Sequence, residues 1–250
     1  MQPRFHTIAL GLCIIWAVLL TGGLAARVVD TSWLSAIETE LKAGSSLVLV
    51  ALSWAAATFA IRDWRPAATL IAAGMTLGCL GDASPLLGSL WPDPQRTLGN
   101  MVLFGLGHVA YIRAFCLIDR AQANQEKRPA IKIWYVSLVL WLVIGTVVWY
   151  FAAYLGPHHA VMRIPALAYT LLLSSTAGVA FGYALSNRLF ALVAIGAILF
   201  LASDVLLAVW IFHDAVYRPF DLVWLTYGVG QMLIVVGSIR NLRALATLAE

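Results

Sequence analysis

Charged residues are scarce in this sequence, and their scarcity excludes an ordinary water-soluble protein. Only 11% of its 250 residues are charged and 62% are hydrophobic, whereas a soluble domain carries roughly 25% charged residues. The shortage leaves long apolar runs, and about 20 mostly apolar residues are enough for one helix to cross a bilayer. The sequence therefore predicts an integral membrane protein.

The apolar runs lack the two-residue alternation of a transmembrane barrel, and helices satisfy their own backbone hydrogen bonds in lipid. We therefore predict an all-α membrane bundle of eight transmembrane helices. The expected spans are roughly Ile8–Ala26, Gly44–Ile61, Ala67–Leu87, Leu98–Leu117, Ile133–Leu155, Ile164–Leu185, Leu189–Phe212 and Leu222–Ile239. The links between them are too short to fold independently, so residues 1–250 are expected to form a single domain.

Cysteines and the common catalytic motifs are also scarce. The three cysteines lie in expected spans without CxxC spacing and are expected to be small packing residues; they are Cys13, Cys79 and Cys116. The sequence contains no G-x-S-x-G motif, P-loop or dinucleotide fingerprint, and no histidine pair has a zinc-binding spacing. A metal site drawn from Asp82, His108, Asp204 and His213 is only a weak candidate. No metal and no other cofactor is therefore expected.

The net charge of +4 is unevenly distributed, and the distribution argues against a nucleic-acid partner. With eight spans, 11 Lys and Arg residues fall on one side and 5 on the other, which accounts for the 16 present. Because cytoplasmic loops carry the excess of Lys and Arg, both termini are expected in the cytoplasm, as in a bacterial inner-membrane protein. The first apolar run, which follows Arg4, also resembles a cleavable signal peptide, and its removal would leave seven helices.

The two halves of the chain resemble each other on either side of a central polar stretch. Gly74 stands eight residues before Asp82, and Gly196 stands eight residues before Asp204, an offset of about 122 residues. Four helices per half is an even number, so we predict two parallel repeats related by an axis along the membrane normal. The predicted half-repeats are approximately residues 1–118 and 133–250. Chance similarity between glycine-rich membrane helices is the simpler alternative.

Ionisable side chains inside a span are costly to bury in lipid and are functional candidates by default. Asp82 and Asp204 are the clearest, His108 is the third, and Lys42 stands at the mouth of the second span. At about 1.5 Å per residue, the aspartates lie roughly 22 Å from the cytoplasmic face and His108 roughly 15 Å from the outer face of a core about 30 Å thick. These groups are therefore expected to converge near the middle or in the outer half of the membrane.

Other polar side chains lie on the same helix faces as these groups. Asn100, His108 and Tyr111 share one stripe of their span, and Tyr227 and Gln231 share one stripe of the last span. Hydrogen bonding between helices is the simpler explanation for Tyr227 and Gln231, and packing explains His108 about as well as a functional role does. Two carboxyl groups at matching depth are harder to explain by packing alone.

These residues carry a resemblance to a known family. The matching pieces are Lys42 before the second span, Gly81-Asp82, Gly107-His108 with Tyr111, Ser203-Asp204, and Tyr227 with Gln231. In their order and placement the sequence resembles the lysoplasmalogenase family, also called YhhN-like, of multi-pass membrane proteins. It departs from the family pattern at Ala43, where a proline usually follows the lysine, and in the long polar insert Trp91–Arg96.

The resemblance implies hydrolysis of the vinyl ether bond of lysoplasmalogens, which yields a fatty aldehyde and glycerophosphoethanolamine or glycerophosphocholine. The implied partners are a lysophospholipid with a vinyl ether and the lipid bilayer, and a homo-oligomer stays open. Cleavage starts with protonation of the β-carbon by an acid, and water then adds to the resulting cation. Two carboxyl groups in different environments suit this chemistry, which requires no metal or redox cofactor.

On this hypothesis Asp82 and Asp204 are the catalytic acid and base, in an order that the sequence leaves open. His108 and Tyr111 would orient one carboxyl group or the water. The remaining candidates would bind the substrate: Tyr227 and Gln231 at the glycerol or against Asp204, Lys42 at the lipid phosphate, and Asn100 on the same stripe as His108.

Three other functions fit the same residues. Parallel repeats and intramembrane carboxylates also suit a proton-coupled small-molecule transporter. A metal-dependent lipid amidase or esterase would use the same aspartate and histidine side chains, and a non-catalytic lipid-binding protein would bind lipid without releasing an aldehyde. Turnover of a lipid by the purified protein, with and without a chelator, separates these alternatives.

Overall fold

The computed structural model describes residues 3–29, 32–84, 94–126, 133–215 and 221–248, and within these ranges the protein is helical without strands. The eight α-helices are α1 (Pro3–Val29), α2 (Ser32–Phe59), α3 (Arg65–Asp82), α4 (Gln95–Glu126), α5 (Ile133–Trp149), α6 (Arg163–Ser186), α7 (Ala191–His213) and α8 (Leu222–Leu248). A π-helical turn, Tyr150–Tyr154, extends α5, and short 3-10 turns precede α6 and α7. The predicted all-α class is confirmed for the described residues.

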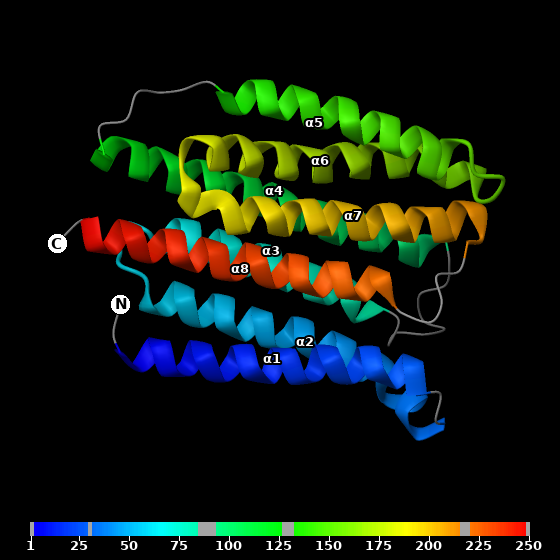
Figure 1. Ribbon diagram of the computed structural model, residues 1–250, viewed down its shortest axis with the longest axis horizontal. Coiled ribbons are helices and arrows are strands. Elements are labelled where there is room, and N and C mark those ends of the chain that lie inside the picture. Colours follow the sequence, from blue (N-terminus) through cyan, green and yellow to red (C-terminus); the bar gives the residue numbers. More distant parts are fainter. Residues whose placement is uncertain (1–2, 30–31, 85–93, 127–132, 216–220, 249–250) are drawn as a thin grey trace.

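The helices lie side by side along the long axis of the molecule, and α1 begins at the same end at which α8 ends (Figure 1). Each helix packs on its neighbour in the chain in the pairs α1–α2, α3–α4, α5–α6 and α7–α8, while α8 also packs on α2 and α3, and α6 on α4. Only 11% of the most apolar segment of α1 and 22% of that of α5 are buried, against 50% for α2 and for α8. The core therefore lies between the inner helices, and α1 and α5 form its flanks.

Seven of the described helices are long and apolar enough to cross a membrane, all except α3. Their outer faces are apolar too: Val18 on α1 and Val136 on α5 expose 63% and 70% of their surface. Such continuous apolar exposure is unfavourable in water and favourable in lipid. The protein is therefore a multi-pass membrane protein.

The one predicted span without a matching long apolar helix is the third along the chain, 67–87, which corresponds to α3. Its predicted end lies beyond the last described residue of that segment. The described helix is short, and it begins at Arg65 and ends at Asp82, which lowers its mean hydropathy. It is nevertheless well buried and packs on α2, α4 and α8. An eighth crossing stays a prediction.

Glycines allow two helix pairs to approach closely at corresponding positions in the two halves. A Cβ atom added to Gly74 of α3 would lie 2.9 Å from the carbonyl oxygen of Gly107 in α4. A Cβ atom added to Gly196 of α7 would lie 2.6 Å from the carbonyl oxygen of Gly230 in α8. Only glycine permits backbones this close. The two pairs are offset by 122 and 123 residues, so the α3–α4 and α7–α8 crossings correspond in position and in packing.

Candidate active site

Asp82 ends α3 and is buried among three other helices. Its side chain accepts hydrogen bonds from the Ser46 hydroxyl of α2 and from the Tyr227 hydroxyl of α8, the latter at 2.6 Å. Only 8% of the surface of Asp82 is exposed. A carboxyl group at this depth requires such donors, because an unpaired buried polar group is costly.

The donors to Asp82 belong to a longer chain of hydrogen bonds. The Gln231 Nε2 group donates to the Tyr227 hydroxyl at 3.3 Å, and the Tyr111 hydroxyl donates to Gln231 Oε1 at 3.1 Å. Tyr227 and Gln231 lie one helical turn apart on α8, and Tyr111 reaches them from α4. Sequence reasoning gave Tyr227 and Gln231 two alternative roles, contact with the glycerol or support of Asp204. The structure connects them to Asp82 rather than to Asp204, and contact with the glycerol stays a prediction.

Asp204 lies near the middle of α7, and its Oδ2 atom accepts a hydrogen bond of 2.7 Å from the Tyr169 hydroxyl of α6. The residue is half-buried. Its carboxyl group is near enough to that of Asp82 to affect it electrostatically. The convergence of these groups at one depth in the membrane stays a prediction.

An aromatic wall borders the two carboxyl groups. Phe104 of α4 and Phe200 of α7 pack edge to face at 5.9 Å between ring centroids, and both contact the ring of Tyr227 at 5.9 and 5.2 Å. The Phe104 ring lies directly against Gly81, where an added Cβ atom would be only 2.6 Å from the ring. The glycine beside Asp82 thus makes room for an apolar side chain.

His108 lies behind this wall and hydrogen-bonds to a residue that sequence reasoning did not consider. Its Nδ1 atom is 2.9 Å from the Thr176 hydroxyl, which also lies 3.2 Å from the Leu172 carbonyl oxygen. The Nδ1 atom donates to that hydroxyl or accepts from it according to the tautomer of the ring. Nε2 is buried without a hydrogen-bond partner, and the ring packs 4.4 Å from that of Phe200.

His108 and Tyr111 were expected to orient a carboxyl group or the water, and their described hydrogen bonds go elsewhere, to Thr176 and Gln231. In the described hydrogen bonds, Tyr111 is linked to Asp82 through Gln231 and Tyr227. Asn100 is half-buried near the N-terminal end of α4, and its Oδ1 atom has no hydrogen-bond partner among the described residues.

Lys42 differs most from its sequence-based placement. It was predicted at the mouth of the second span, but α2 begins at Ser32, so Lys42 lies within the helix with 4% of its surface exposed. Its ammonium group forms ion pairs with Glu38 one turn earlier and with Asp221 at 2.6 Å. The extra helical turns of α2 and these two carboxylates explain how a lysine is tolerated at this depth.

Arg27 completes this ion-pair cluster from the end of α1, 3.2 Å from Asp221 and 3.8 Å from Glu38. Its side chain is 39% exposed, whereas that of Lys42 is 5% exposed. Asp221 also caps α8, because its Oδ1 atom accepts a hydrogen bond from the backbone N–H of Trp224. Of the two cations in this cluster, Arg27 is therefore the accessible one.

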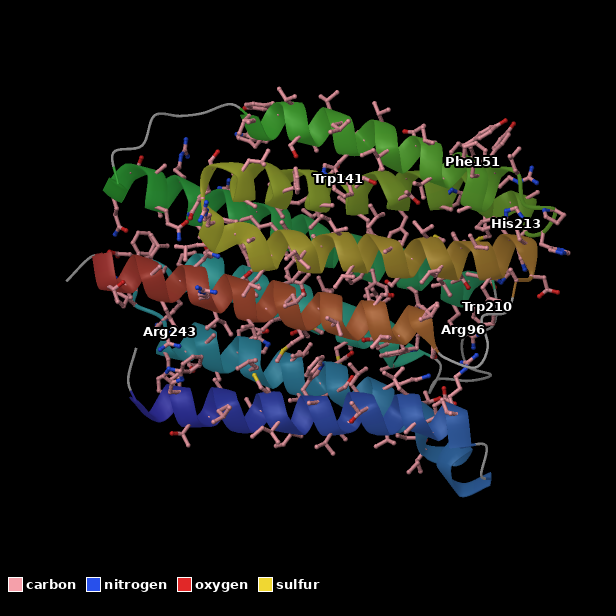
Figure 2. The ribbon with its side chains drawn as sticks, viewed as in Figure 1. Arg96, Trp141, Phe151, Trp210, His213 and Arg243 are labelled. Atoms are coloured by element: carbon pink, nitrogen blue, oxygen red, sulfur yellow. The ribbon has the colours of Figure 1, made fainter. Side chains whose placement is uncertain are left out.

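A pocket of about 240 Å³ adjoins the ion-pair cluster. Its lining combines that cluster with apolar side chains from α7 and α8: Arg27, Glu38, Thr39, Lys42, Leu207, Trp210, Asp221, Leu222, Val223 and Trp224. Three lining residues lie about one helical turn, or about 5 Å along the helix axis, from residues of the aspartate site. On α2 Lys42 precedes Ser46, on α7 Leu207 follows Asp204, and on α8 Trp224 precedes Tyr227. Trp210 marks this end of the bundle, with His213 nearby and Arg243 at the opposite end (Figure 2). The pocket therefore lies one turn beyond the aspartates.

The residues of the weak metal candidate do not assemble into a site. Among the described residues, no group of three or more His, Cys, Asp or Glu side chains is arranged to hold a metal ion. His108 is bound to Thr176, and the His213 Nε2 atom lies 3.1 Å from the backbone oxygen of Phe151.

Sequence reasoning missed Ser46, Tyr169 and Thr176. A serine or threonine in an apolar run usually bonds to its own helix, and a single tyrosine there resembles any interfacial aromatic. A lone hydroxyl on the face turned toward a buried aspartate is the only signal that was present, and the rotation of each helix had to be known to use it.

Comparison with known proteins places this site in a family. Separate searches of curated proteins and of solved structures gave no match. The profile of the YhhN family matches residues 38–238, which include both aspartates, Lys42 and the first part of α8. The chain therefore belongs to the YhhN family, as its motifs predicted.

Proposed function

We propose that this protein is a lysoplasmalogenase-like hydrolase, which cleaves the vinyl ether of a lysoplasmalogen within the membrane. The products are a fatty aldehyde and glycerophosphoethanolamine or glycerophosphocholine. The observation that carries the proposal is the pair of neighbouring carboxyl groups beside an aromatic wall. Asp82 accepts from two hydroxyl groups and Asp204 from one, all on neighbouring helices.

The chemistry of a vinyl ether matches such a pair. Its β-carbon accepts a proton slowly near neutral pH, so a positioned acid accelerates the reaction. An apolar surrounding favours the neutral, proton-bearing form of one carboxyl group. The second group, as a carboxylate, stabilises the resulting cation and activates the water that adds to it. No step requires a metal or redox cofactor.

The pocket supplies a place for the head group. Arg27 is the most accessible cation there and would face the lipid phosphate, whereas Lys42 is already paired with two carboxylates. With the head group in the pocket, the glycerol side of the lipid points toward the aspartates one turn deeper. The hydrocarbon chain would then lie between helices and enter sideways from the bilayer.

This function fits a particular membrane arrangement. We infer eight crossings, with α3 as the eighth, because α1 begins and α8 ends at the same end of the bundle (Figure 1). The excess of Lys and Arg near that end favours cytoplasmic termini. The matching glycine crossings of α3–α4 and α7–α8 favour two parallel repeats, each contributing one aspartate.

Three lysophospholipids with the same head group test this function: one with a vinyl ether chain, one with a saturated ether chain and one with an ester chain. We expect the purified protein in detergent to release aldehyde from the vinyl ether alone, because a saturated ether has no carbon that accepts a proton. A chelator is expected to leave the rate unchanged. Absence of aldehyde would favour the transporter or lipid-binding alternatives, and fatty acid from the ester would favour an esterase.

A further inference from the structure

The two aspartates have different hydrogen-bond environments, and the difference assigns their roles. Among the described residues, two hydroxyl groups donate to Asp82, from Ser46 and Tyr227, and one donates to Asp204, from Tyr169. Hydrogen bonds donated to a carboxylate favour its ionised form. Because two nearby carboxylates repel each other, one of the pair keeps a proton. By the number of donors, Asp82 is the better-stabilised carboxylate of the pair.

The donors to Asp82 also reinforce one another. Tyr111 donates to Gln231, Gln231 donates to Tyr227, and Tyr227 donates to Asp82, so every proton in the chain points toward that carboxylate. Hydrogen bonds aligned in this way polarise one another and strengthen the last bond. Negative charge on Asp82 is therefore supported by residues from α2, α4 and α8.

Asp204 has a single described donor and adjoins the pocket. Leu207, one turn further along α7, lines that pocket. Tyr169 bonds to Oδ2, which orients the carboxyl group without the multiple donors that would favour its ionisation.

We infer that Asp204 is the acid that protonates the lipid, that Asp82 is the carboxylate that activates water, and that Tyr169 is a positioning residue for Asp204. The inference rests on the proposed function and assigns the order of the two groups within it.

The assigned roles give a balanced reaction. The Asp204 carboxyl proton is transferred to the β-carbon of the vinyl ether, which leaves Asp204 ionised and forms an oxocarbenium ion. Water adds to the α-carbon while its proton goes to Asp82, which gives a hemiacetal. Asp82 then returns that proton to the ether oxygen as the bond between the hemiacetal carbon and this oxygen breaks, and the oxygen leaves with glycerol. The hemiacetal hydroxyl proton goes to Asp204. The aldehyde and the glycerol hydroxyl are released, and both aspartates recover their starting states.

Several other titratable groups face the pair and could influence its pH dependence. They are Tyr227 from α8, Tyr111 from α4, Tyr169 from α6 and Cys79 one turn earlier on α3. The charged groups of the ion-pair cluster lie about one turn outward from Ser46, where Lys42 is paired with Glu38 and Asp221. The variants below leave all of these charged groups in place.

The pH dependence of aldehyde release by the purified full-length protein tests the assignment. The rate should rise at low pH as Asp82 ionises and fall at high pH as Asp204 loses its proton, which gives the plot of rate against pH a low-pH limb and a high-pH limb. Ser46→Ala removes a donor to Asp82, so this carboxylate ionises at a higher pH. The low-pH limb is therefore expected to move up by about one pH unit. Tyr169→Phe removes the donor to Asp204, so the acid keeps its proton to a higher pH, and the high-pH limb is expected to move up by about the same amount. Each variant is expected to leave the other limb in place.

Matched controls remove the same groups elsewhere on the same helices. Ser53→Ala on α2 and Tyr183→Phe on α6 remove hydroxyls bonded to Leu49 and Cys116, and both limbs are expected to stay fixed. Ser46→Thr retains a hydroxyl donor and is expected to restore the low-pH limb. The assignment would be overturned if Ser46→Ala moved the high-pH limb and Tyr169→Phe the low-pH limb, or if neither variant moved a limb while staying active. Absence of aldehyde from the wild type would instead overturn the proposed function itself.

Discussion

Replacement of Asp82 or Asp204 by asparagine is expected to lower aldehyde release by about 10² to 10⁴-fold, the usual contribution of one positioned acid or base. Asparagine has nearly the same shape and accepts the same hydroxyl donors through its amide oxygen, but it neither releases nor takes up the proton that the reaction moves. The rate of aldehyde release by each purified variant, measured at saturating lysoplasmalogen, is the relevant quantity.

Both asparagine variants are expected to fold at least as well as the wild type, because each change removes a buried ionisable group. Their thermal unfolding midpoints in detergent check this point. Asp63→Asn is the matched control, since Asp63 is exposed in the turn before α3, and its rate is expected to equal that of the wild type. Retention of the full rate by either aspartate variant would remove that residue from the chemistry.

Lys42→Met is expected to destabilise the protein by about 3–5 kcal/mol, because it leaves the carboxylate of Asp221 buried without its closest cation. The ammonium group joins α2 to the start of α8, and the side chains of Lys42 and Asp221 are only 5% and 7% exposed. Removal of one partner from such a pair costs far more than replacement of both. The free energy of unfolding of the detergent-solubilised protein measures the effect.

The double variant Lys42→Met with Asp221→Asn is expected to recover most of that loss, since asparagine is neutral and is also a good helix cap. Arg27→Met is the comparison on the exposed side of the cluster. Its side chain is 39% exposed, and such ion pairs contribute about 1 kcal/mol or less. Equal losses for Arg27→Met and Lys42→Met would contradict the distinction between the buried and the accessible cation.

The helices were predictable because an apolar run of sufficient length has few alternatives in lipid. The runs indicate where the hydrocarbon core is crossed, but they do not indicate where a helix begins or ends. For that reason α2 begins about three turns before its predicted start, and Lys42 lies inside it rather than at its mouth. Its ion pairs with Glu38 and Asp221 could not be predicted from the apolar run alone.

The aspartates were predictable because an ionisable group in lipid requires a reason, and the YhhN motifs surround both. Their partners were less predictable, because a contact between helices depends on how each helix is rotated. Tyr227 was expected at the glycerol or against Asp204 but donates to Asp82. The described donor to Asp204, Tyr169, had no distinguishing signal in the sequence. Likewise His108 shares a stripe with Tyr111 yet bonds to Thr176.

Cleavage of a vinyl ether by proton transfer to carbon is tested most directly by the mass spectrum of the aldehyde that the purified protein forms in D₂O. The aldehyde should be reduced as it forms, so that later exchange adds no label. We expect one deuterium on the carbon next to the carbonyl group, and loss of this labelled product in both Asp82→Asn and Asp204→Asn. An unlabelled aldehyde, or labelled aldehyde formed as fast by the two variants, would contradict carbon protonation by the aspartate pair.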